Sequence, residues 1–134
     1  MHAVLVRQVW ERAGARCEYC QMPQELDEAT FEIDHIIPRK HGGPTLFANL
    51  ALSCFHCNSH KGPNLGGLAA GARKITPLFH PLRHNWTHHF RWDGPTLVGR
   101  TTIGRVTIMV LGINDPFRVA LREALIRERL FPPR

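Results

Sequence analysis

The chain has 134 residues, of which 43% are hydrophobic and 21% charged, an ordinary balance for one globular domain. No stretch approaches the run of about 18 apolar residues that a transmembrane helix requires. The N-terminal segment also lacks the continuous apolar core of a secretory signal. This composition argues against a membrane protein, and we expect a cytoplasmic location without a membrane partner.

The net charge of +6 is unevenly distributed along the chain. Residues 1–36 carry three bases against seven acids, a net charge of −4, whereas residues 37–134 carry fourteen bases against four acids, a net charge of +10. An excess of positive charge favours a polyanionic partner such as nucleic acid. Many small soluble proteins are basic without binding one, so charge alone does not decide the function.

The first 14 residues predict an amphipathic helix over residues 3–13. Its apolar side chains recur with helical spacing, and Gly14 provides a C-terminal stop. The residues on this apolar face are Val6, Val9, Trp10 and Ala13.

The next segment predicts a strand, a loop, a strand and a short helix. Residues 31–37 alternate between apolar and polar side chains and are rich in β-branched residues, which is typical of a strand, and Pro38 ends it. Residues 38–45 contain two glycines and two prolines and predict a loop. We expect the return strand at residues 50–53 and a helix at 55–61.

The C-terminal half predicts a connector, a hairpin and two helices. Residues 63–85 are expected to form the connector. The Asp93-Gly94 dipeptide predicts a hairpin turn between strands at 86–92 and 95–100. A helix is expected to begin near Thr102.

Asp115 and Pro116 have the residue types of a helix N-cap and first position, which predicts a final helix. We expect five of its side chains to form a buried apolar face, namely Phe117, Ala120, Leu121, Ala124 and Leu125. Its arginines are expected to face solvent, namely Arg118, Arg122, Arg127 and Arg129.

Four cysteines occur as two Cys-x-x-Cys pairs, Cys17/Cys20 and Cys54/Cys57. Together they offer the four thiolates that a tetrahedral structural zinc ion requires, and a zinc site is favoured over disulfides in a reducing compartment. Four protein ligands leave no open coordination position, so we expect one structural Zn²⁺ per chain.

Between the two pairs lies an Asp34-His35 dipeptide, and Asn49 and Asn58 follow. The Asp34 carboxylate is a hard oxygen donor suited to Mg²⁺ or Mn²⁺, and an imidazole with a pKa near 6.5 is suited to accept a proton from water. Neighbouring residues of a strand point to opposite faces, so their convergence requires the strand to twist or end near His35. Asn58 is a candidate second oxygen ligand, and Asn49 is expected to fix the loop backbone and so orient His35.

Five motifs in this order resemble the HNH endonuclease family, specifically its zinc-stapled ββα-metal (His-Me finger) members. They are C-E-Y-C, I-D-H-I-I-P, G-G-P, N-L-A-L-S-C-F-H-C-N and H-K-G, and they cover residues 17–62. The resemblance implies that His35 is the general base, Asn49 a positioning residue, and Asn58 the third signature residue and a metal ligand with Asp34. This third position is often histidine in the family. The colicin-type branch places a further metal-binding histidine where this chain has Gly62, so a two-imidazole metal site is not expected.

Other polar residues carry weaker signals. Arg39, Lys40 and Lys61 are candidates for contacts to nucleic-acid phosphates, with a solvated surface position as the alternative. His60 is a competing ligand, but residues two apart do not share a helix face, which argues against a role beside Asn58. We expect structural or surface positions for the histidines of residues 80–89, in an irregular segment, namely His80, His84, His88 and His89.

Taken together, the sequence predicts a small α+β protein that is one HNH nuclease domain over residues 1–134. A zinc-bound ββα core with its N-terminal helix spans 1–62, the connector 63–85, and the hairpin-and-helix extension 86–134. We expect Mg²⁺- or Mn²⁺-dependent hydrolysis of DNA, with nicking because a monomer has one active site; the family resemblance implies 5′-phosphate and 3′-hydroxyl products. The alternatives are a non-catalytic zinc-knuckle module that binds nucleic acid and an RNA-directed nuclease. Sequence specificity, oligomeric state and pathway stay open at this point.

Overall fold

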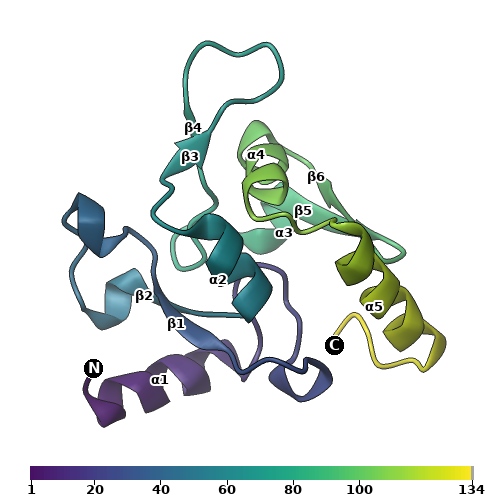
Figure 1. Cartoon of the computed structure of the whole chain (residues 1–134), viewed down its shortest axis with the longest axis horizontal. Helices are drawn as coiled ribbons and strands as arrows, with labels where there is room; N and C mark the ends of the chain where they lie inside the picture. The colour runs from purple at the N-terminus through teal and green to yellow at the C-terminus, as the bar shows by residue number, and fades with distance from the viewer. Residues whose placement is uncertain (134) are drawn as a thin grey trace. The chain divides into compact units, whose positions relative to one another are not determined.

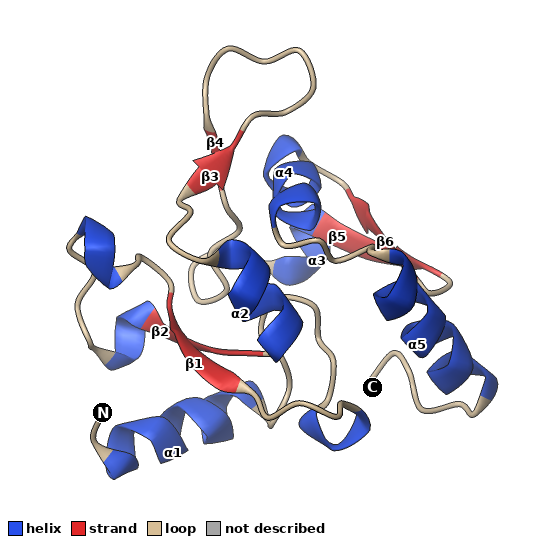
Figure 2. Cartoon of the chain, in the orientation of Figure 1, coloured by secondary structure: helices blue, strands red, loops and turns tan. Residues whose placement is uncertain are grey.

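The computed structural model describes residues 1–133 and divides the chain into two compact units, Met1–Asn64 and Leu65–Arg134 (Figure 1). Both units combine helices with short antiparallel strands (Figure 2). The predicted α+β class is therefore confirmed. The helices formed by the described residues are all too short or too polar to cross a lipid bilayer.

The first unit consists of a helix, a two-stranded sheet and a second helix. These elements are α1 (Ala3–Ala13), β1 (Glu32–His35), β2 (Leu50–Ser53) and α2 (Phe55–Lys61). Three single-turn 3-10 helices lie between them, at Gln24–Leu26, Arg39–His41 and Phe47–Asn49. The predicted order of strand, loop, strand and helix is confirmed, and β1 and β2 pair antiparallel with Asp34 opposite Ala51.

Arg12 and Glu18 connect α1 to the sheet. The Arg12 guanidinium binds both carboxylate oxygens of Glu18, at 3.2 and 3.0 Å, and also donates to the Leu50 carbonyl. The second oxygen of Glu18 accepts from the Leu52 amide at 2.9 Å, while the Glu18 amide donates to the Leu52 carbonyl at 2.8 Å. The segment after α1, which carries Cys17, is thereby fixed along the edge of β2.

The second unit contains two short β-ladders and three helices. Its elements are β3 (Gly66–Gly67), β4 (Thr76–Pro77), α3 (Trp86–His89), β5 (Phe90–Asp93), β6 (Thr96–Gly99), α4 (Thr102–Val110) and α5 (Pro116–Arg127). α4 packs closely on the β5–β6 hairpin because Gly104 has no side chain. A Cβ atom at this position would lie 2.2 Å from the His89 carbonyl oxygen.

Two expectations for residues 63–92 need correction. The segment expected as a connector contains the β3–β4 ladder and contributes Leu78 and Phe79 to the buried core. Residues 86–89, expected in a strand, form the helical turn α3, and β5 begins only at Phe90. The cause is a local cap, since the Asn85 side chain accepts a hydrogen bond from the Thr87 amide at 3.1 Å and so favours a helix start.

The predicted faces of α5 are confirmed only in part, since Leu125 is buried and Arg127 is exposed as expected but other positions differ. Arg118 and Arg122 are buried, with 6% and 1% of their surface exposed, whereas Phe117 is 64% exposed. Arg122 is buried because its guanidinium group satisfies backbone carbonyls of two loops. It donates to the carbonyl oxygens of Pro95 at 2.7 Å and Ile113 at 2.9 Å. Its guanidinium also lies over the ring of Trp92, 5.2 Å from the ring centroid.

Replacing Arg122 with Met is therefore expected to destabilise the second unit. The substitution leaves two buried carbonyls without this donor, which lowers the free energy of unfolding by about 1–3 kcal/mol. Arg127→Met is the matched control, because Arg127 is exposed on the same helix and pairs with the exposed Glu123. Thermal unfolding of the two variants measures the difference, and equal midpoints would contradict the structural role of Arg122.

Candidate functional site

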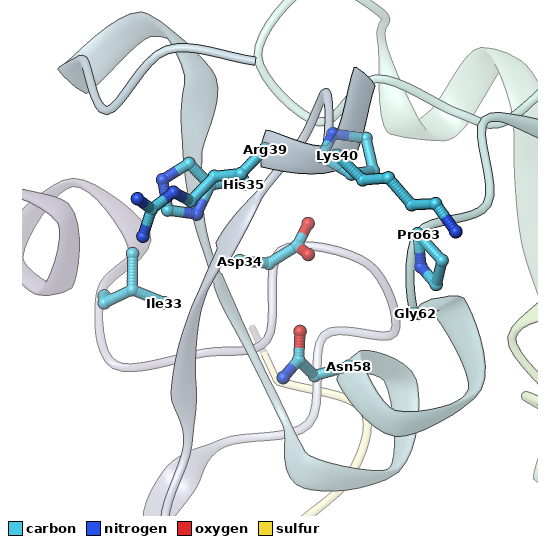
Figure 3. Close-up of a pocket in the computed structure, with 9 residues that line it drawn as sticks. Ile33, Asp34, His35, Arg39, Lys40, Asn58, Gly62 and Pro63 are labelled. Carbon is cyan, nitrogen blue, oxygen red and sulfur yellow. The ribbon is translucent and has the colours of Figure 1, made fainter. Parts of the chain in front are cut away.

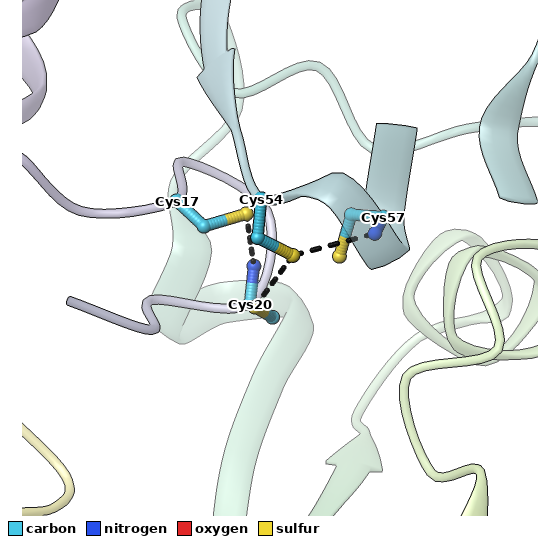
Figure 4. A group of neighbouring side chains, drawn as sticks. All are labelled: Cys17, Cys20, Cys54 and Cys57. Carbon is cyan, nitrogen blue, oxygen red and sulfur yellow. Dashed lines mark hydrogen bonds between the residues drawn. The ribbon is translucent and has the colours of Figure 1, made fainter. Parts of the chain in front are cut away.

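The four cysteines meet at one buried point of the first unit (Figure 4). Their sulfur atoms all lie within 4.8 Å of one another, and the Sγ atoms of Cys20 and Cys54 are 3.8 Å apart. Tetrahedral zinc with Zn–S bonds of about 2.3 Å places its sulfur ligands about 3.8 Å apart, whereas a disulfide requires about 2.05 Å. The cluster thus fits the expected structural Zn²⁺ and is not a pair of disulfides.

Tyr19 connects this cluster to the Asp34 carboxylate. Lying between Cys17 and Cys20, it is 1% exposed and donates its hydroxyl hydrogen to Asp34 Oδ2 at 2.6 Å. Burial, followed by the neighbouring Asp34 charge, raises the pKa of Tyr19 well above its usual value, so the phenol stays a donor. Tyr19 was not among the site residues predicted from the sequence. The only sequence signal for it is an aromatic residue inside the first Cys-x-x-Cys pair.

Lys61 holds the other oxygen of Asp34. Its ammonium group donates to Asp34 Oδ1 at 3.1 Å and to the His35 carbonyl at 3.0 Å, and the residue is only 1% exposed. We expected Lys61 on the surface as a phosphate contact, but its buried ion pair with Asp34 makes it unavailable for that role. Burial raises the pKa of the Asp34 carboxyl, and Lys61 and Tyr19 oppose this shift.

His35 is the last residue of β1. The strand therefore ends at the Asp34-His35 dipeptide, as we expected for two neighbouring side chains that serve one site. Its Nε2 atom lies 2.8 Å from Thr45 Oγ1. Burial, followed by the Arg39 charge, lowers the pKa of His35 below its usual value. The imidazole is therefore neutral at neutral pH, as a general base must be.

Asn49 fixes the loop that carries Thr45. Its side-chain oxygen accepts from the Ile37 amide at 2.9 Å, and its nitrogen donates to the carbonyls of Pro44 at 2.8 Å and Ile37 at 3.1 Å. The amide thus joins both ends of the loop, and Pro44 directly precedes the hydroxyl partner of His35. This geometry agrees with a positioning role through the backbone.

Asn58 is the middle residue of α2 and faces β1. Its side-chain nitrogen donates to the carboxylate of Glu32, and its side-chain oxygen and the Asp34 carboxylate turn toward the same space (Figure 3). Asp34, His35 and Asn58 line one pocket of about 290 Å³. Arg39 and Lys40 also line this pocket, so five of the predicted site residues are brought together.

The other histidines singled out from the sequence do not line this pocket. His60 does not line this pocket, and its Nδ1 atom lies 2.9 Å from the His56 carbonyl. In the second unit, His84 and His89 pack against the ring of Phe79, with centroid separations of 5.9 and 5.7 Å. His80 accepts backbone hydrogen bonds within its own turn, so this histidine cluster has the expected structural character.

Comparison with known proteins agrees with this geometry. Residues 17–64 match the family model described as HNH endonuclease, which covers the cysteine cluster and the pocket. These residues form an HNH endonuclease domain. Septu protein PtuB of Bacillus thuringiensis is 27% identical over 119 residues, 87% of this chain and 43% of that protein. The chain thus spans less than half the length of this relative. No solved structure matches the chain significantly.

The sulfur geometry predicts one zinc ion per chain in the purified protein. Chelation, or Cys57→Ser, is expected to remove the zinc and unfold the HNH domain, because the metal would join the Cys17/Cys20 turn to the start of α2. Metal analysis by atomic emission together with circular dichroism measures both effects. A fully folded protein without metal would contradict this expectation.

Proposed function

We propose that the HNH domain is a divalent-metal-dependent endonuclease that hydrolyses phosphodiester bonds of DNA. The observation that carries this proposal is the single pocket that combines an imidazole, His35, with two oxygen donors, Asp34 and Asn58. Phosphodiester hydrolysis requires a base for the attacking water and positive charge beside the phosphate. A module that only binds nucleic acid requires no general base.

The donor atoms fit Mg²⁺ or Mn²⁺, because both ions prefer carboxylate and carbonyl oxygens. Asp34 Oδ2 accepts a hydrogen bond from Tyr19 and Oδ1 accepts one from Lys61, so each oxygen keeps a second lone pair for an ion. Asn58 donates through its nitrogen to Glu32, which leaves its oxygen available. A bound ion would supply the positive charge that stabilises the pentacovalent phosphorus and the leaving oxygen.

His35 is proposed as the general base. With Nε2–H donated to Thr45 Oγ1, the Nδ1 atom carries the free lone pair that takes a proton from water. The water oxygen then bonds to phosphorus as the P–O3′ bond breaks, and the leaving 3′ oxygen takes a proton from solvent water to become a hydroxyl, while His35 returns its proton to solvent. The products are a 5′-phosphate and a 3′-hydroxyl, and one site per chain produces nicks.

A nucleic-acid substrate is supported by the cations that line the pocket and by the net positive charge of the second unit. Arg39 and Lys40 line the pocket and are proposed to contact phosphates next to the cleaved bond. The second unit carries eleven bases against four acids, a net charge of +7, whereas the first carries six against seven, a net charge of −1. Exposed arginines of the second unit, such as Arg91, Arg100 and Arg105, therefore favour binding of a polyanion.

His35→Ala is expected to reduce the cleavage of supercoiled plasmid in Mg²⁺ or Mn²⁺ by at least about 100-fold, the usual contribution of a general base. His2→Ala is the matched control, because His2 is an exposed histidine that does not line the pocket. Relaxed circles measure nicking, and linear plasmid measures paired cuts. Zinc content and circular dichroism show that the variants are folded.

Undiminished cleavage by zinc-loaded His35→Ala would contradict the assignment of the base. Wild-type protein that cuts structured RNA but not plasmid would contradict DNA as the substrate. Wild-type protein that shifts DNA in a gel without cutting either nucleic acid would contradict the enzyme and support a binding module.

A further inference from the structure

The β3–β4 ladder of the second unit carries a loop that projects into solvent. The ladder consists of two residue pairs, Gly66 with Pro77 and Gly67 with Thr76, and residues 68–75 connect its strands. Figure 1 shows this connection extending from the ladder as a long loop. Residues 70–75 are all exposed. We call residues 66–77, the ladder with its loop, the arm.

The arm has a fixed base and a defined tip. Gly67 lies against α4, since a Cβ atom at this position would approach the Val110 side chain to 2.8 Å. At the tip, the Ala72 amide donates to the Ala69 carbonyl at 2.9 Å, and Gly71 supplies the positive φ of +75° that this turn requires. The arm is therefore a structured hairpin with a tip of small residues.

The arm carries positive charge that the fold does not use. Arg73 and Lys74 follow the turn at the tip, and both are exposed. Neither side chain has a hydrogen bond or an ion pair with any residue that the structure describes. The sequence contains no aspartate or glutamate between Asp34 and Asp93, so no acid near the arm in sequence neutralises the two cations.

Two large apolar side chains lie beside these cations. Leu68 is 51% exposed and Ile75 is 71% exposed, the largest exposure of any large apolar side chain within residues 1–133. They lie on opposite sides of the arm, directly beyond the last pair of the ladder. Single exposed apolar side chains are common in proteins. An apolar pair next to two cations on a projecting hairpin, however, has the composition of a segment that binds a nucleic-acid groove.

We propose that the arm enters the minor groove of a DNA duplex, with Arg73 and Lys74 on the phosphates of the groove edges and Leu68 and Ile75 against sugars and base edges. The minor groove is about 6 Å wide, so it admits a tip of glycine and alanine more readily than a bulky one. Proteins that bind there combine arginine or lysine with apolar side chains. This inference rests on the proposed nuclease function, because it assigns a contact to the DNA substrate.

A lipid surface also attracts apolar groups that are flanked by cations. Two apolar side chains are too few for stable attachment, since even one myristoyl chain gives only marginal membrane binding. The absence of acids along the neighbouring sequence favours a polyanion of high charge density instead. Duplex DNA is therefore the partner that the arm fits best.

The test measures binding of a short A·T-rich duplex by fluorescence anisotropy over a range of salt concentrations. Zinc-loaded His35→Ala protein is used so that the duplex stays intact. The further substitutions Arg73→Gln and Lys74→Gln together are expected to weaken binding and to lower the slope of log Kd against log salt by about 2, since each phosphate contact contributes about 0.9. The matched control, Arg127→Gln with Arg129→Gln, removes the same charge from exposed positions of the second unit and should leave the slope nearly unchanged.

Two further measurements test the groove and the apolar contact. Netropsin, which occupies the minor groove of A·T-rich DNA, is expected to weaken binding by protein with an intact arm and to have little effect on the Arg73/Lys74 variant. Ile75→Ala is expected to weaken binding about tenfold without changing the salt slope, because it removes an apolar contact and no charge. Phe117→Ala, at another exposed apolar side chain of this unit, is its control and should not weaken binding. Circular dichroism and zinc content show that each variant is folded.

Unchanged affinity and salt slope in the Arg73/Lys74 variant would overturn the inference while leaving the proposed nuclease intact. Equal losses in this variant and its control would show a diffuse charge effect and would also overturn it. Binding that netropsin does not affect would exclude the minor groove. Binding to vesicles of anionic lipid that the arm substitutions abolish, with duplex binding unchanged, would replace DNA by a membrane as the partner. Wild-type protein that neither binds the duplex nor cuts plasmid would contradict the proposed function itself.

Discussion

The four-cysteine cluster determines where both partners of Asp34 lie. Tyr19 sits inside the first cysteine pair, and Lys61 ends the helix that begins at the second pair, with Cys54 as its N-cap. The two groups approach the carboxylate from segments that are more than 40 residues apart in sequence. Zinc binding contributes on the order of 10–16 kcal/mol in small zinc-dependent peptides, enough to hold such segments together. A metal without an open coordination position can therefore control the site by positioning Asp34.

A second, uncharged network fixes the imidazole. Asn49 joins the two ends of the loop after β1, and Thr45 in that loop contacts His35. Asp34 and His35 are consecutive residues, yet a buried charged network holds the Asp34 carboxylate and the Thr45 hydroxyl contacts the His35 imidazole. This separation has a functional consequence under the proposed mechanism. A change at Lys61 acts directly on the Asp34 carboxylate, whereas a change in the loop acts on the hydroxyl partner of His35.

The local elements of the first unit were predictable because each has its own sequence signal. Alternation and Pro38 predict a strand over residues 31–37, of which the structure forms Glu32–His35, and the spacing of the cysteine pairs predicts the sulfur cluster. Asp34, His35 and Asn58 were predicted from motifs, and the structure places them around one pocket. These signals lie within short segments of the sequence, so they can be recognised without knowledge of the tertiary structure.

The residues that were missed depend on distant partners. Lys61 and Arg122 both read as surface cations, yet each is buried by acceptors that come from other segments, Asp34 in one case and the Ile113 carbonyl in the other. Composition and helical periodicity carry no information about such acceptors. The same holds for Tyr19, whose partner lies 15 residues further along the chain.

The central claim is that the pocket bounded by Asp34 and Asn58 holds a divalent ion beside a nucleic-acid phosphate, separate from the structural zinc. Anomalous X-ray scattering tests it most directly, using crystals of zinc-loaded His35→Ala protein with a DNA duplex and Mn²⁺. The account predicts a zinc peak among the four cysteine sulfurs and a manganese peak in contact with Asp34, Asn58 and a phosphate oxygen. A manganese peak elsewhere, or DNA bound away from this pocket, would contradict it.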